Sequence, residues 1–253
     1  MTPLFEVTWK GQSIDPVVAA FHVISQATNT ADSGHLLLQD PEGLIAPQVK
    51  AGDAIRIRWG YQEDAALTPI FHGVARDVQA RGLQTVVHLI DWQTLLQARG
   101  RVITRTWDQS TPAEIAGDLI AGTGLTLAAQ APDLTIDRFP VHGLTPKEAL
   151  LQLVHWVRRE ADIKLRFFVR DGQLVLAEPD HAQTAVHAIE TGVNLIDQRP
   201  GRLGLLEVET LVAPVLHSQV VTIDGTRWFV EEAQYRWQAG GRLVLQVAPC
   251  ATS

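Results

Sequence analysis

Two segments of the sequence carry strong helix signals, and the same tetrapeptide pattern, Thr-Pro-x-Glu, introduces both. In this pattern the threonine hydroxyl accepts from a helix-opening amide, and the glutamate three residues later reaches back to the threonine amide, which makes a capping box. Proline suits the first helical turn because no hydrogen bond is lost there. The pattern therefore predicts helices that begin directly after Thr111 and Thr145.

Apolar residues at helical spacing follow each cap. The first stripe is Ile115, Ala116, Leu119 and Ile120, and the second is Ala149, Leu150, Leu153, Val154 and Val157. An array of 34-residue helical repeats would need a second helix between the two motifs. Residues 125–143 contain two prolines and no helical stripe, so the sequence predicts two separate amphipathic helices and no repeat array.

Elsewhere the dominant patterns are alternation or short apolar runs between Gly, Asp, Asn and Pro, which are typical of strands. Arg81-Gly82 and Asp171-Gly172 predict hairpin turns, and residues 92–100 predict a helical turn. The predicted strands are residues 5–9, 17–25, 35–39, 54–59, 70–80, 83–91, 164–169, 173–178, 185–190, 203–212, 219–224, 227–237 and 242–248.

Two long hairpins share a weak internal similarity at a constant offset of 158 residues (229 − 71 = 158). Phe71, Ala75, Gly82 and Val86 match Phe229, Ala233, Gly240 and Val244. Chance matching of two alternating hairpins is the competing explanation. The pattern predicts a mainly β (α+β) fold in which two similar small β-barrels, residues 1–100 and 164–253, flank a connector with two short amphipathic helices, residues 101–163.

Composition narrows the classes of function. The net charge of −7 over 253 residues argues against a general binder of phosphate backbones. A single cysteine, Cys250, leaves no partner for an internal disulfide and no cysteine metal cluster. The sequence shows neither an export signal nor a membrane anchor, so we expect synthesis in the cytoplasm.

Catalytic and metal-binding motifs are missing from the sequence. It contains no phosphate loop and no serine elbow, and its nine histidines lack the spacing of metal ligands. We therefore expect no catalytic residue, no cofactor and no metal. Trp9, Trp59, Trp228 and Trp237 lie in predicted strands, where they either stack on sugar rings or pack in the core and at interfaces.

The order of these parts resembles the baseplate hub proteins of tailed bacteriophages, and is similar to the hub half of type VI secretion spike proteins. The resemblance covers residues 3–248. It rests on GDAIRIRWGYQ followed by IFHGVARDVQ, on LIDWQTLLQARG, on Thr-Pro-x-Glu-Ile-Ala ending in Thr-Gly-Leu, on LTPKEALLQLVHW leading to RFFVRDGQLVLAEP, and on the closing SQVVTIDGTRWFVEEAQYRW.

The resemblance implies a non-enzymatic virion protein of the phage tail baseplate, in which three chains form a homotrimeric ring of barrels around a channel. Its expected partners are a tail tube or distal tail protein, a separate spike protein and the baseplate wedge proteins. DNA is expected to pass through without specific binding, repelled by acidic residues of the channel wall.

Permanent trimer contacts need large interfaces with apolar and aromatic centres. The candidate interface residues are Trp59, Tyr61, Phe71, Trp228, Phe229 and Trp237. Two other classes of function stay open. A split-barrel enzyme would hold a cofactor such as a flavin between subunits, and a carbohydrate-binding module of a tail or cell-surface protein would use the strand tryptophans.

Overall fold

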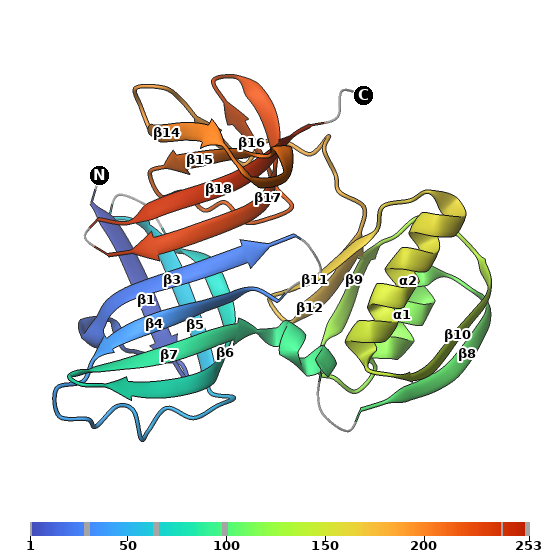
Figure 1. The fold of residues 1–253 in the computed structure, drawn as a ribbon, viewed down its shortest axis with the longest axis horizontal. Coiled ribbons are helices and arrows are strands. Elements are labelled where there is room, and N and C mark those ends of the chain that lie inside the picture. Colours follow the sequence, from blue (N-terminus) through green and yellow to red (C-terminus); the bar gives the residue numbers. More distant parts are fainter. Residues whose placement is uncertain (1, 28–30, 63–65, 98–100, 239, 251–253) are drawn as a thin grey trace. The chain divides into compact units, whose positions relative to one another are not determined.

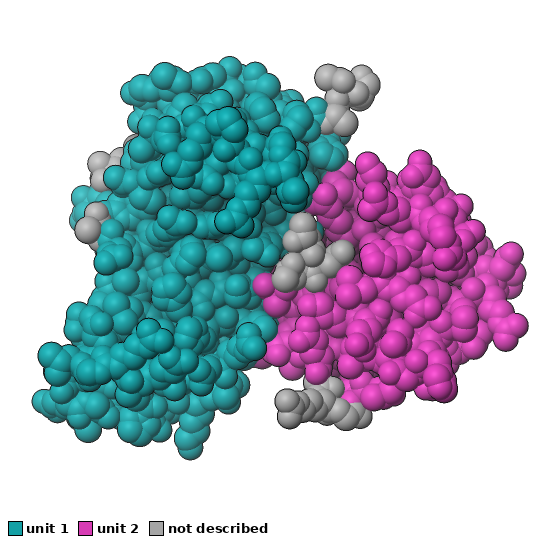
Figure 2. Space-filling view, viewed as in Figure 1, with its two compact units in different colours: residues 1–27, 32–91, 180–253 teal, residues 28–31, 92–179 magenta. Residues whose placement is uncertain are grey.

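The computed structural model of the chain describes residues 2–27, 31–62, 66–97, 101–238 and 240–250. The chain forms two compact units, shown in Figure 2. Unit 1 consists of residues 1–27, 32–91 and 180–253, and unit 2 of residues 28–31 and 92–179. The chain thus leaves unit 1 after Asp91 and returns to it at Asp180.

Unit 1 is a single sheet of 13 strands. Its strands are β1 (Pro3–Trp9), β2 (Gln12–Ser13), β3 (Val18–Gln26), β4 (Ser33–Gln39), β5 (Ala54–Tyr61), β6 (Thr68–Arg81), β7 (Gln84–Asp91), β13 (His187–Ile189), β14 (Leu195–Pro200), β15 (Leu206–Thr210), β16 (Val220–Ile223), β17 (Thr226–Trp237) and β18 (Arg242–Pro249). Short 3-10 turns lie at Asp15–Val17 and Arg202–Gly204.

The sheet runs in the order β14-β15-β18-β17-β3-β4-β7-β6-β5-β1-β2, and β16 extends from β17 to β13. The decisive junction is β3 with β17, which pair antiparallel from Phe21↔Trp237 to Gln26↔Glu232. Strands from the two ends of the sequence therefore lie side by side in one sheet (Figure 1).

This junction corrects the prediction of two separate barrels. Among the described strands no closed barrel forms, because the pairing path starts at β14 and stops at β2. Alternation tells which side chains of a strand share a face, but it does not tell which strands pair. The unpaired backbone groups of β3 and β17 satisfy each other, so the two predicted halves merge.

One apolar core lies under this sheet and draws on both ends of the chain. Phe21 of β3 lies edge-on to Trp59 of β5, with 5.3 Å between ring centroids. Trp59 in turn lies 5.1 Å from Trp237 of β17. The fully buried Tyr235 donates its hydroxyl proton toward the backbone carbonyls of Ala213 and Val215. The prediction of a mainly β fold is confirmed. Unit 1 has one apolar core shared by both ends of the chain, where the prediction had a separate barrel at each end.

The repeated strand–hairpin order found in the sequence is present in the structure. β5 pairs with the β6–β7 hairpin, and β16 pairs with the β17–β18 hairpin, all antiparallel. Gly82 turns the first hairpin with a φ of 61° and Gly241 belongs to the second turn with a φ of 55°. Positive φ favours glycine at both turns.

Unit 2 contains two small sheets and two helices. Its elements are β8 (Ile103–Ser110), α1 (Pro112–Ile120), β9 (Thr126–Gln130), β10 (Ile136–Leu144), α2 (Pro146–Ala161), β11 (Arg166–Arg170) and β12 (Gln173–Ala177). β8 pairs with β10, and β9 joins the β11–β12 hairpin by parallel pairing to β12. A 3-10 turn at Trp92–Gln97 confirms part of the turn predicted for residues 92–100; residues 98–100 lie outside the described part of the chain.

The β11–β12 hairpin corrects a second expectation, since the sequence placed it in the second barrel. The Asp171-Gly172 turn is present, with φ values of 48° and 78°. The hairpin nevertheless pairs with β9 of unit 2, and its apolar residues join the core of that unit. A turn sequence predicts that two strands form a hairpin, but it does not predict which third strand pairs with that hairpin. The division into domains at residues 1–100, 101–163 and 164–253 stays a prediction.

Both capping boxes are confirmed. The amide of Glu114 donates to the Thr111 hydroxyl at 3.2 Å, and the Thr111 amide donates to the Glu114 carboxylate at 2.8 Å. Thr145 and Glu148 repeat these bonds at 3.3 and 2.8 Å. The predicted stripes of both helices are buried in the core of unit 2. No helix in the described ranges has the length and apolar character needed to cross a membrane.

Candidate functional site

The most extensive functional feature of unit 1 is the outward face of eight consecutive antiparallel strands, from β14 through β15, β18, β17, β3, β4 and β7 to β6. Alternate residues of these strands point into the core, so the remaining ones share the opposite face. Polar and charged residues dominate that face, which we call the polar face. Its members come from strands far apart in the sequence and meet only through the pairing register.

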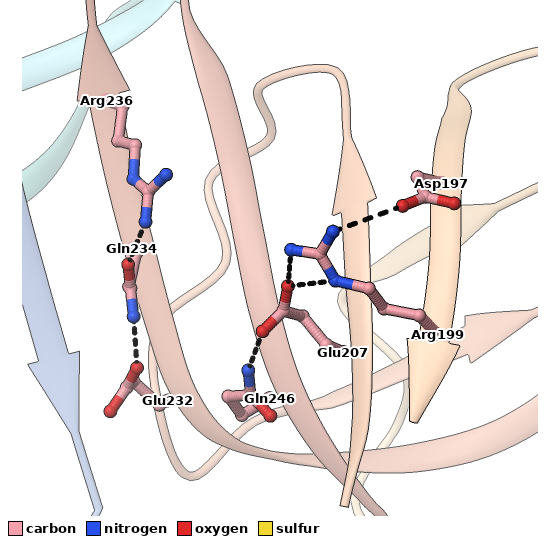
Figure 3. Close-up of polar contacts among 7 residues, drawn as sticks. All are labelled: Asp197, Arg199, Glu207, Glu232, Gln234, Arg236 and Gln246. Carbon is pink, nitrogen blue, oxygen red and sulfur yellow. Dashed lines mark hydrogen bonds and ion pairs between the residues drawn. The ribbon is translucent and has the colours of Figure 1, made fainter. Parts of the chain in front are cut away.

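One row of side chains crosses β14, β15 and β18 in register. Arg199 lies opposite Glu207, and Glu207 lies opposite Gln246. The Arg199 Nε donates to the Glu207 carboxylate at 2.8 Å, and the Gln246 amide donates to its other oxygen at 2.6 Å (Figure 3). Asp197 adds a longer ion pair to Arg199 at 3.7 Å. The hydrogen bond from Arg199 to Glu207 raises the pKa of the Arg199 guanidinium.

The row continues onto β17 and β3. Glu232 lies opposite both Gln246 and Gln26, and the Gln26 amide donates to it at 2.9 Å. Along β17 the amide of Gln234 donates to Glu232, while Arg236 donates to Gln234 at 2.8 Å, as Figure 3 shows. Glutamine amides therefore take part in two separate hydrogen-bonded groups, one around Glu207 and one around Glu232, and each group holds its side chains in place.

A second row carries three histidines. The register aligns Arg236 with His22, His22 with His35, His35 with His88, and His88 with Asp77. The rings of His22 and His35 lie 5.5 Å apart between centroids. The sequence showed these histidines as scattered, because 13 and 53 residues separate them (35 − 22 and 88 − 35). Strand pairing brings them together.

The balance of charge on the polar face differs from the acidic wall expected for a channel. Its carboxylates have cationic partners: Glu207 pairs with Arg199, and Glu209 lies 3.3 Å from the Arg242 guanidinium. Glu232 is hydrogen-bonded to two glutamines. These carboxylates are therefore held by ion pairs or by hydrogen bonds from glutamine amides.

Both ends of the eight-strand path have an unpaired edge within the described residues. β14 pairs only with β15. β6 pairs with β5 as far as Val74, and the Ala75 amide donates to the Asp53 carbonyl. From Arg76 to Arg81 its described strand partner is β7 alone. Exposed backbone donors and acceptors on such edges are ready to pair with another strand.

Exposed apolar side chains accompany the β14 edge. Ile196 in β14 is 44% exposed, and Val193 just before it is 69% exposed. Leu203, in the turn after β14, is fully exposed and has a φ of 55°. A non-glycine residue at positive φ is uncommon and costs backbone strain. This edge therefore combines pairing capacity with apolar surface, a combination that monomeric proteins usually cover.

The six aromatic interface candidates divide into two groups. Trp59, Phe71 and Phe229 are buried inside unit 1, at most 3% exposed. Tyr61, Trp228 and Trp237 are half-buried at the edge of the same core. A role in contacts between subunits stays a prediction for all six. Sequence reasoning found the aromatic residues and missed the polar rows and unpaired edges, which depend on strand pairing.

The two rival functions require exposed strand tryptophans for sugar stacking or a cluster of side chains that holds a cofactor. Of the four strand tryptophans proposed for sugar stacking, Trp59 is buried and Trp9, Trp228 and Trp237 are half-buried. Trp9 donates its indole proton to Asp53 at 2.9 Å. The described residues contain no group of three or more His, Cys, Asp or Glu side chains placed to hold a metal ion.

Comparison with solved structures gives the same fold over almost the whole chain. The 43 kDa tail protein of prophage MuSo2 from Shewanella oneidensis matches with a TM-score of 0.72 and 12% identity, over 97% of this chain and 96% of that chain. A tail protein from Neisseria meningitidis matches at 0.73 and 12%, over 98% and 97%. The chain has the fold of prophage tail proteins.

A type VI secretion component belongs to the same structural group. This E. coli protein, whose structure is similar to the T4 bacteriophage tail proteins gp27 and gp5, matches with a TM-score of 0.69 and 12% identity, over 97% of this chain and 77% of that chain. No protein-family model matches the sequence, and no curated protein matches it. At 12% identity these likenesses establish the fold, and the predicted resemblance is confirmed at that level.

Proposed function

We propose that this chain is a structural hub of a phage-tail baseplate, which assembles as a homotrimeric ring around a channel and catalyses no reaction. The observation that carries the proposal is the eight-strand polar face of unit 1, bounded by the edge of β14 on one side and by the Arg76–Arg81 stretch of β6 on the other. The shared fold with prophage tail proteins and with a type VI secretion component supports the same role.

Ring closure follows from the direction of the strands. Each neighbouring pair of strands from β14 to β6 is antiparallel. Because the path has eight strands, its first strand, β14, runs antiparallel to its last strand, β6. The β6 edge of one copy then meets the β14 edge of the next copy in an antiparallel orientation.

The dimensions of such a ring suit a channel. Three copies supply 24 strands (3 × 8), and at about 4.8 Å per strand they give a circumference of about 115 Å and a backbone diameter of about 37 Å. Strand tilt widens a barrel further. This leaves room for duplex DNA or an extended protein, with the polar face as the wall. The apolar cores then lie outside the channel.

The proposed partners follow from the same arrangement. A tail tube or distal tail protein stacks on one rim of the ring, a separate spike protein on the other, and baseplate wedge proteins on the outer surface. The protein would then be located in the baseplate of the virion. DNA passes along the polar face without base-specific contacts.

The oligomeric state of edge variants tests this proposal. Ile196→Lys puts a charge on the exposed β14 edge, where it repels pairing. We expect the wild-type chain to reach a trimer mass in light scattering and the variant to shift at least about tenfold in protein concentration toward monomer, since a disrupted edge costs about 1.4 kcal/mol or more.

Val102→Lys is the matched control, because Val102 is also an exposed apolar residue, 61% exposed, and lies in unit 2. It should leave the trimer intact. A chain that stays monomeric at high concentration and in the presence of its neighbouring tail proteins would contradict the hub. A trimer that resists Ile196→Lys would contradict edge pairing through β14.

A further inference from the structure

The histidine row of the polar face lines a cavity that the channel role leaves unexplained. The cavity has a volume of about 610 Å³. It is lined by His22, Ile24, Ser33, Gly34, His35, Arg76, Asp77, Gln79, His88 and Leu89. Three imidazoles from three adjacent strands and one guanidinium therefore surround a single hollow. Protonation of these rings would make the hollow more cationic.

The construction of the hollow depends on a close approach of two strands. Gly34 of β4 packs so tightly on β3 that a Cβ there would lie 2.3 Å from the His22 carbonyl oxygen. Position 34 therefore has to be glycine for the strands that carry His22 and His35 to pair this closely. The His22 Nε2 is buried and has no hydrogen-bond partner within the described structure. A polar atom of this kind gains most from a ligand that accepts a hydrogen bond.

The charged and titratable groups around the hollow set its response to pH. They are His22 of β3, His35 of β4, His88 of β7, Arg76 and Asp77 of β6, and Glu232 and Arg236 of β17. Burial lowers the pKa of His22, and Arg236 lowers it further. Burial and then His88 lower the pKa of His35. An anion between these rings would favour their protonated forms by opposing the charge repulsion.

Two carboxylates oppose an anion and therefore locate it within the hollow. A hydrogen bond from Gln79 lowers the pKa of Asp77, which also interacts with His88. Asp77 therefore stays ionised in mildly acidic solution and places its negative charge on the His88 side of the hollow. Glu232 is bonded to Gln26 and Gln234, and its charge acts on His22 more weakly than burial and Arg236, which lower the pKa of that ring. The cationic region that remains lies between His22, His35 and Arg76.

We propose that this hollow is a binding site for a tetrahedral oxyanion, either a free anion or a phosphoryl group of nucleic acid, and that His22, His35 and Arg76 hold it when the imidazoles are protonated. Doubly protonated imidazoles and guanidinium groups donate charge-assisted hydrogen bonds to such oxygens. The site would exist in each isolated chain, so its presence or loss is independent of ring assembly.

Sulfate is the probe for the first test, because its charge does not change between about pH 5.5 and pH 7.5. Sulfate is titrated into the full chain at constant ionic strength, with histidine side-chain NMR as the readout. We expect binding at least about tenfold tighter at the lower pH, from added charge near the anion, with shifts in the His22 and His35 signals. Equal affinity at the two pH values would overturn the proposal.

Variants separate the site from general attraction of anions. His35→Gln keeps a polar side chain and removes its titration, so it should reduce the pH dependence, and adding His22→Gln should abolish most of the rest. Arg76→Gln should weaken sulfate at both pH values alike. His142→Gln, at an exposed strand position of unit 2, is the matched control and should change nothing. Identical behaviour of His35→Gln and His142→Gln would refute the site.

A competition experiment identifies the source of the anion. A short DNA duplex that displaces sulfate at low pH assigns the site to phosphoryl groups of nucleic acid. A duplex that leaves sulfate bound assigns it to free anions. Thermal unfolding of each variant accompanies the titrations, and a variant that binds no sulfate although it unfolds like the wild type supports the proposal.

Discussion

The two units of the molecule obtain their folds in opposite ways. Unit 2 is built almost entirely from one continuous stretch, residues 92–179, and each of its helices begins at a capping box four residues long. Unit 1 joins strands from the two ends of the chain, because β3 pairs with β17 more than 200 residues later. Local signals thus govern unit 2, whereas long-range pairing governs unit 1 and creates its polar face.

The largest expected effect lies in the aromatic core of unit 1. Trp59 is 2% exposed and contacts Phe21 and Trp237, so Trp59→Ala should lower the free energy of unfolding by about 3–5 kcal/mol. Hydrogen exchange should show the loss in unit 1. Trp228→Ala, at a half-buried position, should cost less.

The same pair of variants tests the interface assignment. A Trp59→Ala protein that keeps its stability but loses its trimer would place Trp59 at a subunit interface and contradict its role in the core.

A smaller effect is expected from one buried hydroxyl of unit 1. The Tyr235 oxygen accepts from the Val215 amide at 2.9 Å and lies 2.9 Å from the Ala213 carbonyl. Tyr235→Phe leaves these buried backbone groups without their partner and should cost about 1–3 kcal/mol in denaturant unfolding. Unchanged stability would mean that the loop at residues 213–215 rearranges freely, and would weaken the view that long-range contacts order unit 1.

Cap removal should have a smaller, local effect confined to unit 2. Thr145→Ala and Thr111→Ala should each cost about 1 kcal/mol, measured as faster amide exchange in α2 and α1. Thr145→Ser keeps the accepting hydroxyl and serves as the control. Faster exchange in the strands of unit 1 as well would show that the two units unfold together, which removes the contrast drawn between them.

The pH dependence of stability should be the smallest effect, and it should differ between the two units. The pKa values of His22, His35 and His187 are lowered mainly by burial, and all three lie in unit 1. Between the lowered values and about 6.5 the unfolded chain binds more protons than the folded one. Stability of unit 1 should therefore fall as the pH decreases through this window, and level off below the folded pKa values.

Unit 2 should respond only in more acidic solution. Hydrogen bonds from Thr111 and Thr145 lower the pKa values of Glu114 and Glu148. Their contribution is present above about pH 4.5 and is lost as the pH falls through the lowered values. Hydrogen exchange at about pH 7 and pH 5.5, corrected for intrinsic rates, should show loosening in unit 1 alone. The double variant His22→Gln, His35→Gln should reduce that loosening.

Sequence reasoning succeeded where the governing interaction is local. The caps at Thr111 and Thr145 and the turns at Gly82 and Gly172 depend on a few neighbouring residues, and all were predicted. β8 and β10 were missed, since exposed charged and polar residues interrupt their apolar alternation.

No local sequence pattern predicts which strands pair with each other. Nothing near His22 indicates that it lies opposite His35, or that Glu232 lies opposite Gln26. A slip of one residue in either strand would send these side chains to the other face. The aromatic candidates can be chosen from the sequence by residue type alone, whereas the polar rows can be found only from the register of the paired strands.

The pairing of β3 with β17 also sets the order of events during synthesis. At about 5–20 residues per second, the ribosome needs about 10–40 s to proceed from Gln26 to Glu232. Throughout that interval β3 has no β17 beside it, while the residues of unit 2 have already emerged and can fold. The edge of β3 that later pairs with β17 therefore stays open until the last hairpin arrives, and the sheet of unit 1 is complete only at the end of translation.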